Sequence, residues 1–321
     1  MPVIKAAVVQ KGARGSDTGA TLEEALATIA ECGSEGAKLV VFPEAYLGGY
    51  PKGADFKVAI GHRTPEGREE FNLYAKAAIE VPGAETRAIS EAAQAAGCFV
   101  TIGVIERDGG TIYCTALYFG PEGALLGKHR KLMPTASERL CWGFGDGSTL
   151  DTVETPWGRM GAVICWENYM PMMRMAMYDQ DISFYCAPTA DDRDSWAATM
   201  RHVALEGRCF VLSACQYLTG ADFPQGMGNV LGSEDDRVLM RGGSMIIDPL
   251  GQVLAGPVFD AETILYADLD TDQINRGKFD FDVAGHYARP DVFHLSVDDT
   301  PRPPATRAST LPSAGRRFSN D

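Results

Sequence analysis

The stretch Gly161-Ala-Val-Ile-Cys165-Trp166-Glu167-Asn168-Tyr169-Met170-Pro171 contains an apolar run that stops at a cysteine, followed by polar residues and a proline. Proline is tolerated in the first turn of a helix because the N–H group that it lacks would have no intrahelical partner there. The pattern therefore predicts a strand that ends at Cys165 and a helix that begins at Pro171.

A cysteine between a strand and a helix has two interpretations. Unpaired N–H groups and the positive end of a helix dipole favour the thiolate over the thiol, which would make Cys165 nucleophilic. The alternative is a buried structural cysteine, because free cysteine is among the most buried residue types. Residues elsewhere in the chain are needed to distinguish a nucleophilic from a structural Cys165.

Length, composition and charge limit the classes of protein to which this chain can belong. The chain has 321 residues, 45% of them hydrophobic, which suffices for one large domain or two small ones with a sizeable core. A formal net charge of −14 argues against a nucleic-acid backbone or an anionic membrane surface as the main partner. The N-terminus is typical of a strand and not of a signal peptide, and no apolar run approaches the roughly 18 residues of a membrane span. We therefore expect a cytoplasmic protein.

Cysteine and histidine usage indicates neither disulfides nor a metal. The eight cysteines form no C-x-x-C pair, which is typical of reduced intracellular thiols. No spacing of histidines, cysteines and carboxylates supports a metal site. His202, in a predicted helix, is interpreted as a structural or interface residue. The cysteines are residues 32, 98, 114, 141, 165, 186, 209 and 215.

The order of predicted elements indicates an α/β fold. A strand at 3–9, a helix capped by Thr21 and a strand at 38–42 form a βαβ-type opening. The turn Asp108-Gly109-Gly110 predicts an antiparallel hairpin, so the sheet is mixed. The remaining predicted strands are 98–105, 111–119, 124–132, 150–154, 159–164, 182–186, 209–215, 242–247, 252–255 and 264–269, and the remaining helices are 65–80, 83–96, 171–178 and 196–207. They fall into two groups, as in two facing sheets covered by helices.

Two charged residues follow predicted strands. Glu44 lies in a loop rich in glycine and proline after strand 38–42, and Lys131 lies at the end of strand 124–132. Ligands bind at this end of open α/β sheets. Taken alone, Glu44 is equally compatible with a loop carboxylate tied to backbone N–H groups or an arginine, and Lys131 with a solvated strand end. With Cys165 they would supply a base, a donor for a developing anion and a nucleophile.

Three blocks carry a resemblance to a known family. Val41-Phe-Pro-Glu44, His129-Arg-Lys131-Leu-Met-Pro134 and Ile164-Cys165-Trp166-Glu167 resemble the signature blocks of the nitrilase superfamily. The longer stretches 165–171, 187–191 and 205–216 are similar to the true nitrilases of bacteria and plants. Amidase branches usually carry a different pair after the cysteine, commonly Tyr-Asp. The resemblance predicts a domain over residues 1–295 and a tail at 296–321 that is disordered in the free protomer or makes oligomer contacts.

The resemblance also implies a fold and a set of site residues. It implies an α-β-β-α sandwich of two mixed sheets, no cofactor, and a catalytic triad formed by Glu44, Lys131 and Cys165. The family's additional carboxylate corresponds to Glu138. Family members pair across the helical layer that follows the cysteine and often extend into spiral assemblies, so we expect a homo-oligomer built from dimers.

The activity implied is hydrolysis of an organic nitrile to a carboxylic acid and ammonia, through a thioimidate and a thioester on Cys165. Tyr50, Trp142 and Trp166 are predicted to form walls of the substrate pocket, because each lies next to a catalytic block; simple core packing is the alternative. Aromatic walls would suit an apolar or aryl-bearing nitrile. Two other functions stay open, an amidase or carbamoylase with the same triad and a non-catalytic assembly or thiol-sensor protein.

Overall fold

The computed structural model describes residues 3–232 and 234–303. Its α-helices are α1 (Thr18–Ser34), α2 (Pro65–Ala77), α3 (Ala84–Ala96), α4 (Pro171–Tyr178), α5 (Asp194–Gly207) and α6 (Asp272–Asp280). Four short 3-10 helices are η1 (Ala136–Leu140), η2 (Gly147–Thr149), η3 (Cys165–Tyr169) and η4 (Gly220–Asp222). The strands of the two sheets follow below.

The first sheet contains the N-terminal strands. Its order is β14 (Thr263–Asp270), β1 (Val3–Gln10), β2 (Ala37–Val41), β4 (Phe99–Asp108), β5 (Thr111–Phe119) and β6 (Leu125–Arg130), and β3 (Ile79–Glu80) pairs with β4. The pairs β1–β2 and β2–β4 are parallel, whereas β4–β5 and β5–β6 are antiparallel. The sheet is therefore mixed, as the predicted hairpin required.

The second sheet repeats this format. Its order is β11 (Tyr217–Thr219), β12 (Val238–Ile247), β10 (Phe210–Cys215), β9 (Ile182–Thr189), β8 (Gly158–Ala162) and β7 (Val153–Thr155), and β13 (Val253–Phe259) pairs with β12. The pairs β8–β9 and β9–β10 are parallel, so the ends of these strands lie side by side. The residues that follow β8 and β9 are thereby brought together.

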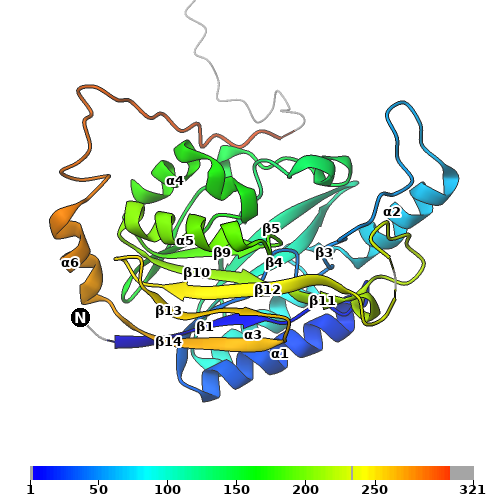
Figure 1. Cartoon of the computed structure of the whole chain (residues 1–321), viewed down its shortest axis with the longest axis horizontal. Coiled ribbons are helices and arrows are strands. Elements are labelled where there is room, and N and C mark those ends of the chain that lie inside the picture. The colour runs from blue at the N-terminus through cyan, green and yellow to red at the C-terminus, as the bar shows by residue number, and fades with distance from the viewer. Residues whose placement is uncertain (1–2, 233, 304–321) are drawn as a thin grey trace, which may run out of the picture.

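Three apolar clusters define the layers. One cluster lies between the sheets and includes Val8 and Leu39 of the first sheet with Phe184 and Leu212 of the second. A second packs α1 and α3 on the outer face of the first sheet, and a third packs α4 and α5 on the outer face of the second. Figure 1 shows these helix pairs on opposite sides of the strands. The predicted α-β-β-α sandwich is confirmed.

Several element boundaries differ from the prediction, and two of the differences have a clear physical cause. Helix α1 begins at Thr18 because the Asp17 carboxylate accepts the Ala20 N–H, while the Thr21 hydroxyl donates to the Asp17 carbonyl instead of capping the helix. The predicted helix 65–80 ends at Ala77, since the chain becomes extended and Ile79–Glu80 pairs with β4 as β3. Local propensity favours continuation there, and the sheet pairing overrides it.

The segment after α6 contains no helix or strand within the described residues 281–303. The N–H group of Arg302 donates to Asp146 at 2.7 Å, so part of the predicted tail contacts the loop before η2. Residues 304–321 of that tail lie outside the described residues. Within the described part of the chain, no helix is both long and apolar enough to cross a bilayer.

Candidate active site

Cys165 lies at a strained turn between β8 and η3. Its φ of +51° falls in the left-handed region, which costs a non-glycine residue about 1–2 kcal/mol. The Asn168 side chain opposes this strain, because its Nδ2 donates to the carbonyl oxygens of Val163 at 2.9 Å and Cys165 at 2.8 Å. Arg174 in turn donates to the Asn168 carbonyl at 2.7 Å. The surroundings thus hold the turn in one conformation.

Glu44 and Lys131 form a buried ion pair that joins two strands of the first sheet. Glu44 follows β2 and Lys131 follows β6, and the Lys131 Nζ donates to Glu44 Oε1 at 2.6 Å. Both side chains are fully buried. The solvated-strand-end interpretation of Lys131 is therefore wrong. Glu44 Oε2 is also buried and has no hydrogen-bond partner among the described residues.

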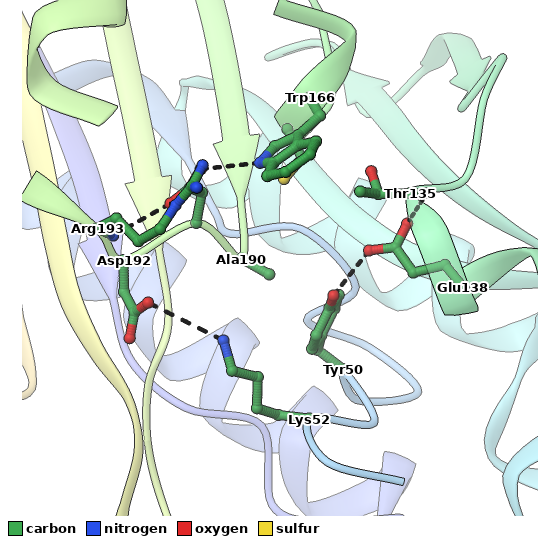
Figure 2. A pocket seen from close by; sticks show the side chains of 10 residues that line it. Tyr50, Lys52, Thr135, Glu138, Trp166, Ala190, Asp192 and Arg193 are labelled. Atoms are coloured by element: carbon green, nitrogen blue, oxygen red, sulfur yellow. Dashed lines mark hydrogen bonds and ion pairs between the residues drawn. The ribbon is translucent and has the colours of Figure 1, made fainter. Parts of the chain in front are cut away.

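Glu138 completes the cluster from η1. Its Oε2 accepts a hydrogen bond from Lys131 Nζ at 2.7 Å and another from the Thr135 N–H group at 2.6 Å. Its Oε1 accepts from the Tyr50 hydroxyl at 2.7 Å, as Figure 2 shows. Lys131 is consequently held between two carboxylates.

The cluster raises the pKa of both Glu44 and Lys131, but for different reasons. Burial raises the pKa of the Glu44 carboxyl, and the Lys131 ammonium opposes that rise without cancelling it. Burial alone would lower the pKa of Lys131, but the charge of Glu44, together with those of Cys165, Cys114 and Glu138, outweighs burial and holds the pKa well above its ordinary value. Lys131 stays an ammonium ion, while Glu44 becomes a stronger base than an ordinary glutamate.

The Cys165 thiol does not have the lowered pKa that the sequence predicted. Burial, followed by the nearby Glu44 carboxylate, raises the pKa of Cys165, although Lys131 partly opposes the shift. The expected helix dipole is weak at Cys165, because Cys165 begins the short η3 and α4 starts only at Pro171. The Thr189 hydroxyl lies 3.2 Å from the Cys165 Sγ as a donor. The resting side chain is a thiol that needs a base.

A cavity of about 230 Å³ opens onto this cluster (Figure 2). The predicted residues Tyr50, Glu138, Cys165 and Trp166 line it. The other lining residues are Lys52, Thr135, Ala190, Asp191, Asp192 and Arg193. Glu44 and Lys131 lie behind it, since Lys131 contacts Glu138 from the buried side.

Trp142 does not line this cavity. Its surroundings fit the alternative interpretation, simple core packing, and not a pocket wall. Its indole N–H donates to the Tyr74 hydroxyl at 3.0 Å, and its side chain is 2% exposed. The ring packs edge-on against Tyr50 and lies 5.4 Å below the Lys131 ammonium. Trp142 therefore supports two site residues from behind.

The charged rim of the cavity was not predicted from the sequence. The Asp191 carboxylate accepts the Trp166 indole N–H at 2.8 Å and is paired with Arg193. The Arg193 guanidinium lies over the Trp166 indole, and Figure 2 shows these two side chains close together. Lys52 and Asp192 face each other at 4.0 Å. One signal was available, because Thr189 ends β9 and Asp191 follows it, and β9 is parallel to the strand that leads to Cys165.

The described residues contain no group of three or more histidine, cysteine and carboxylate side chains that could hold a metal ion. The cations near Cys165 are already paired with carboxylates. The arrangement can supply a nucleophile, a base and a fixed positive charge, which are the parts needed to attack a polarised carbon–nitrogen bond.

Comparison with known proteins agrees with this fold and site. Residues 5–279 match the family model for carbon-nitrogen hydrolases. A carbon-nitrogen hydrolase from Helicobacter pylori G27 has the same fold with a TM-score of 0.71, at 19% identity, covering 91% of this chain and 97% of that one. The chain therefore belongs to the carbon-nitrogen hydrolase family.

Closer relatives define the branch. An aliphatic nitrilase of Sinorhizobium fredii is 68% identical over 94% of this chain and 98% of its own length. A nitrilase of Bradyrhizobium diazoefficiens is 59% identical over 96% of both chains. A bifunctional nitrilase/nitrile hydratase of Lupinus angustifolius is 53% identical over 96% of this chain and 90% of its own. Within the family, the chain stands in the branch of the bacterial and plant nitrilases.

Proposed function

We propose that this protein is a nitrilase that converts an organic nitrile and two water molecules into a carboxylic acid and ammonia. The observation that carries the proposal is a cavity lined by Cys165, with the buried Glu44–Lys131 pair behind it and one Glu44 oxygen left without a partner among the described residues. The high identity to named nitrilases along almost the whole chain supports the same activity.

In the first half of the reaction, Glu44 Oε2 takes the proton of the Cys165 thiol as sulfur attacks the nitrile carbon. One π bond of the nitrile breaks, a carbon–sulfur bond forms, and the proton passes to nitrogen to give a thioimidate. Lys131 stabilises the negative charge that develops on nitrogen, together with N–H groups at the start of η3. The Thr189 hydroxyl helps by donating to the sulfur.

In the second half, a water molecule adds to the thioimidate carbon and ammonia leaves, which produces a thioester. Glu44 then accepts a proton from a second water, which attacks the thioester and releases the acid and the Cys165 thiol. Glu138 keeps Lys131 in place through both halves. If the first tetrahedral intermediate expels sulfur instead of ammonia, the product is an amide.

A small aliphatic nitrile is the substrate that fits best. The cavity of about 230 Å³ is smaller than the roughly 300–1,000 Å³ of sites for drug-sized ligands. Its rim is charged, and Trp166 is its main aromatic wall. The 68% identical relative is named an aliphatic nitrilase. This narrows the apolar or aryl-bearing substrate class suggested by the sequence.

Two further observations support a proposed location and a proposed assembly. All eight cysteines are free and seven are buried, which supports a reducing, cytoplasmic environment. Tyr169, Met172 and Leu205, around α4 and α5, are 42%, 67% and 40% exposed. Exposed apolar residues on this layer support the proposed pairing of two subunits across it. The extension of such dimers into a spiral assembly rests on the family resemblance alone.

The proposed function is tested by measuring ammonia release from aliphatic and aryl nitriles beside the matching amides. We expect turnover of aliphatic nitriles, a trapped adduct on Cys165 by mass spectrometry, and no turnover by folded C165A. Turnover of amides alone would replace the proposal with an amidase. Absence of both turnover and adduct would favour a non-catalytic protein.

A further inference from the structure

A buried carboxylate next to the nucleophile has no role in the steps above. Glu167 lies in η3 and its side chain is fully buried. Its Oε1 accepts the N–H group of Leu132 at 2.6 Å, and its Oε2 accepts the N–H group of Ile164 at 2.8 Å. Leu132 directly follows Lys131, and Ile164 directly precedes Cys165. One carboxylate thus contacts the neighbours of both reacting side chains.

These two backbone segments belong to different sheets. Lys131 and Leu132 continue from β6 of the first sheet, whereas Ile164 follows β8 of the second. We propose that Glu167 is a positioning residue that fixes the separation between the Lys131 ammonium and the Cys165 sulfur across the sandwich. The role matters because a displacement of about 1 Å between reacting groups can cost about 10²-fold in rate.

His129 provides the third contact of Glu167. Its Nε2 lies 3.0 Å from Glu167 Oε2, and its Nδ1 lies 3.1 Å from the carbonyl oxygen of Thr149. Both ring nitrogens face acceptors, so the ring donates to both only when it is doubly protonated. Burial by itself raises the pKa of Glu167, but His129 and the two backbone donors outweigh burial and lower it. Glu167 is therefore an ionised link with all its contacts satisfied.

A glutamine cannot replace this link, although its size is the same. Each carboxylate oxygen accepts a backbone N–H group, whereas an amide offers one acceptor oxygen and one NH₂ donor. In E167Q the NH₂ group must face the N–H of either Leu132 or Ile164, and one segment is pushed away. Aspartate keeps two acceptor oxygens on a shorter side chain, so E167D should retain part of the link.

The experiment compares E167Q, E167D and a control, E70Q, with the wild type. Glu70 is also a buried glutamate that accepts a backbone N–H, from Gly228, but it contacts none of the residues in the proposed mechanism. We expect E167Q to lower kcat by about 10- to 100-fold with little change in KM. E167D should recover part of the loss, and E70Q should keep the wild-type kcat even if its unfolding temperature falls.

The inference rests on the proposed function for its nitrile assay, so a second measurement is independent of nitrile turnover. The rate of Cys165 alkylation by iodoacetamide, followed by mass spectrometry, should fall severalfold in E167Q and stay unchanged in E70Q. Failure of the wild type to hydrolyse any nitrile counts against the proposed function alone. Equal alkylation rates in wild type and folded E167Q, or equal kcat values, would overturn the positioning role.

If E167Q does not fold, E167D decides the question, because its shorter side chain cannot reach the N–H groups of Leu132 and Ile164 at the native distances. A kcat lowered severalfold at constant KM in folded E167D supports the positioning role. A wild-type kcat together with a wild-type rate of Cys165 alkylation overturns it.

Discussion

Two buried glutamates of the first sheet pair with cations from the same short segment, yet their surroundings differ. Glu106 accepts hydrogen bonds on both oxygens, from Lys128, the Arg130 guanidinium and the Thr115 hydroxyl. Glu44 accepts from Lys131 and the Cys114 thiol on Oε1, while its Oε2 has no partner within the described residues. The first carboxylate is satisfied and the second is not.

The pKa shifts follow this difference. Hydrogen bonds and charges from Arg130 and Lys128 overcome the burial of Glu106 and lower its pKa, whereas burial dominates at Glu44 and raises its pKa. Strand alternation separates the two roles, because successive residues of a strand face opposite sides. Lys128 and Arg130 thus reach Glu106, and Lys131 reaches Glu44. In the structural ion pair, both carboxylate oxygens of Glu106 have hydrogen-bond partners. In the proposed base, Glu44, one carboxylate oxygen has no partner within the described residues.

The largest expected effect separates these roles directly. E44Q should abolish nitrile turnover because no group remains to take the Cys165 proton, while E106Q should keep activity. E106Q should lower the free energy of unfolding by about 3 kcal/mol, since it removes the partner of two cations. E44Q should be less destabilising, because ionising Glu44 in the folded state opposes stability and Glu138 still pairs with Lys131. Turnover and urea unfolding measure both, and an active E44Q would contradict the assignment.

Substitutions of Lys131 and Lys128 compare the cations that pair with Glu44 and Glu106. K131Q should lower kcat by about 10²–10³, the cost of losing one donor to a developing anion. K128Q should leave kcat close to wild type, because Lys128 contacts Glu106 and Arg130 still pairs with that carboxylate. Steady-state kinetics on folded variants decide the matter. An equal loss of kcat in K131Q and K128Q would mean that catalysis depends on the total charge of segment 128–131 and not on the position of Lys131.

The pH dependence should distinguish the two carboxylates in one protein. Glu44 must be ionised to act as a base, and its raised pKa means that kcat/KM falls with decreasing pH earlier than for an ordinary glutamate. Glu106 has a lowered pKa, so the stability that it contributes is present above its ordinary pKa and is lost only as pH falls through the lower folded value. Activity should therefore decline on acidification before the circular dichroism changes. Simultaneous loss would contradict this order.

The smallest expected effect concerns the second thiol of the site. The Cys114 Sγ lies 3.5 Å from Glu44 Oε1 and is buried, and the S–H group is a weak donor. C114A should lower kcat only a few-fold by loosening Glu44, and C114S should restore it through a stronger donor. Kinetics of the two variants at constant pH measure the effect, and a loss as large as that of E44Q would show that Cys114 has a more direct role.

The sequence predicted the fold through local signals. The hairpin at Asp108-Gly109-Gly110 is present with Asp108 opposite Thr111, and α3 ends at Gly97, whose φ is +61°. Apolar runs and turn residues act over short distances, so they can be read from neighbouring positions. The same reasoning misplaced the start of α1 and the end of α2, where an Asp17 cap and a tertiary strand pairing decide.

The candidate site was predictable only in part. Glu44, Lys131 and Cys165 were selected because each follows a predicted strand and lies in a block similar to a known family. Cys165 lines the cavity, and the buried pair of Glu44 and Lys131 lies behind it. Trp142 was misassigned because adjacency in sequence says nothing about which face of a loop is buried. Asp191 and Arg193 were missed because their relation to Trp166 depends on the parallel pairing of β8 and β9.

By itself the sequence determined most of the order of strands and helices, although not β3, β11 or α6. It also determined the chemical groups available at strand ends and the family they resemble. The tertiary structure alone decided the electrostatic state of those groups, since the pKa of Cys165 depends on burial and on a carboxylate more than a hundred positions away. It also decided that Glu167 joins the two sheets. Burial and long-range contacts arise only when the sandwich closes, and the open oxygen of Glu44 exists only in that closed arrangement.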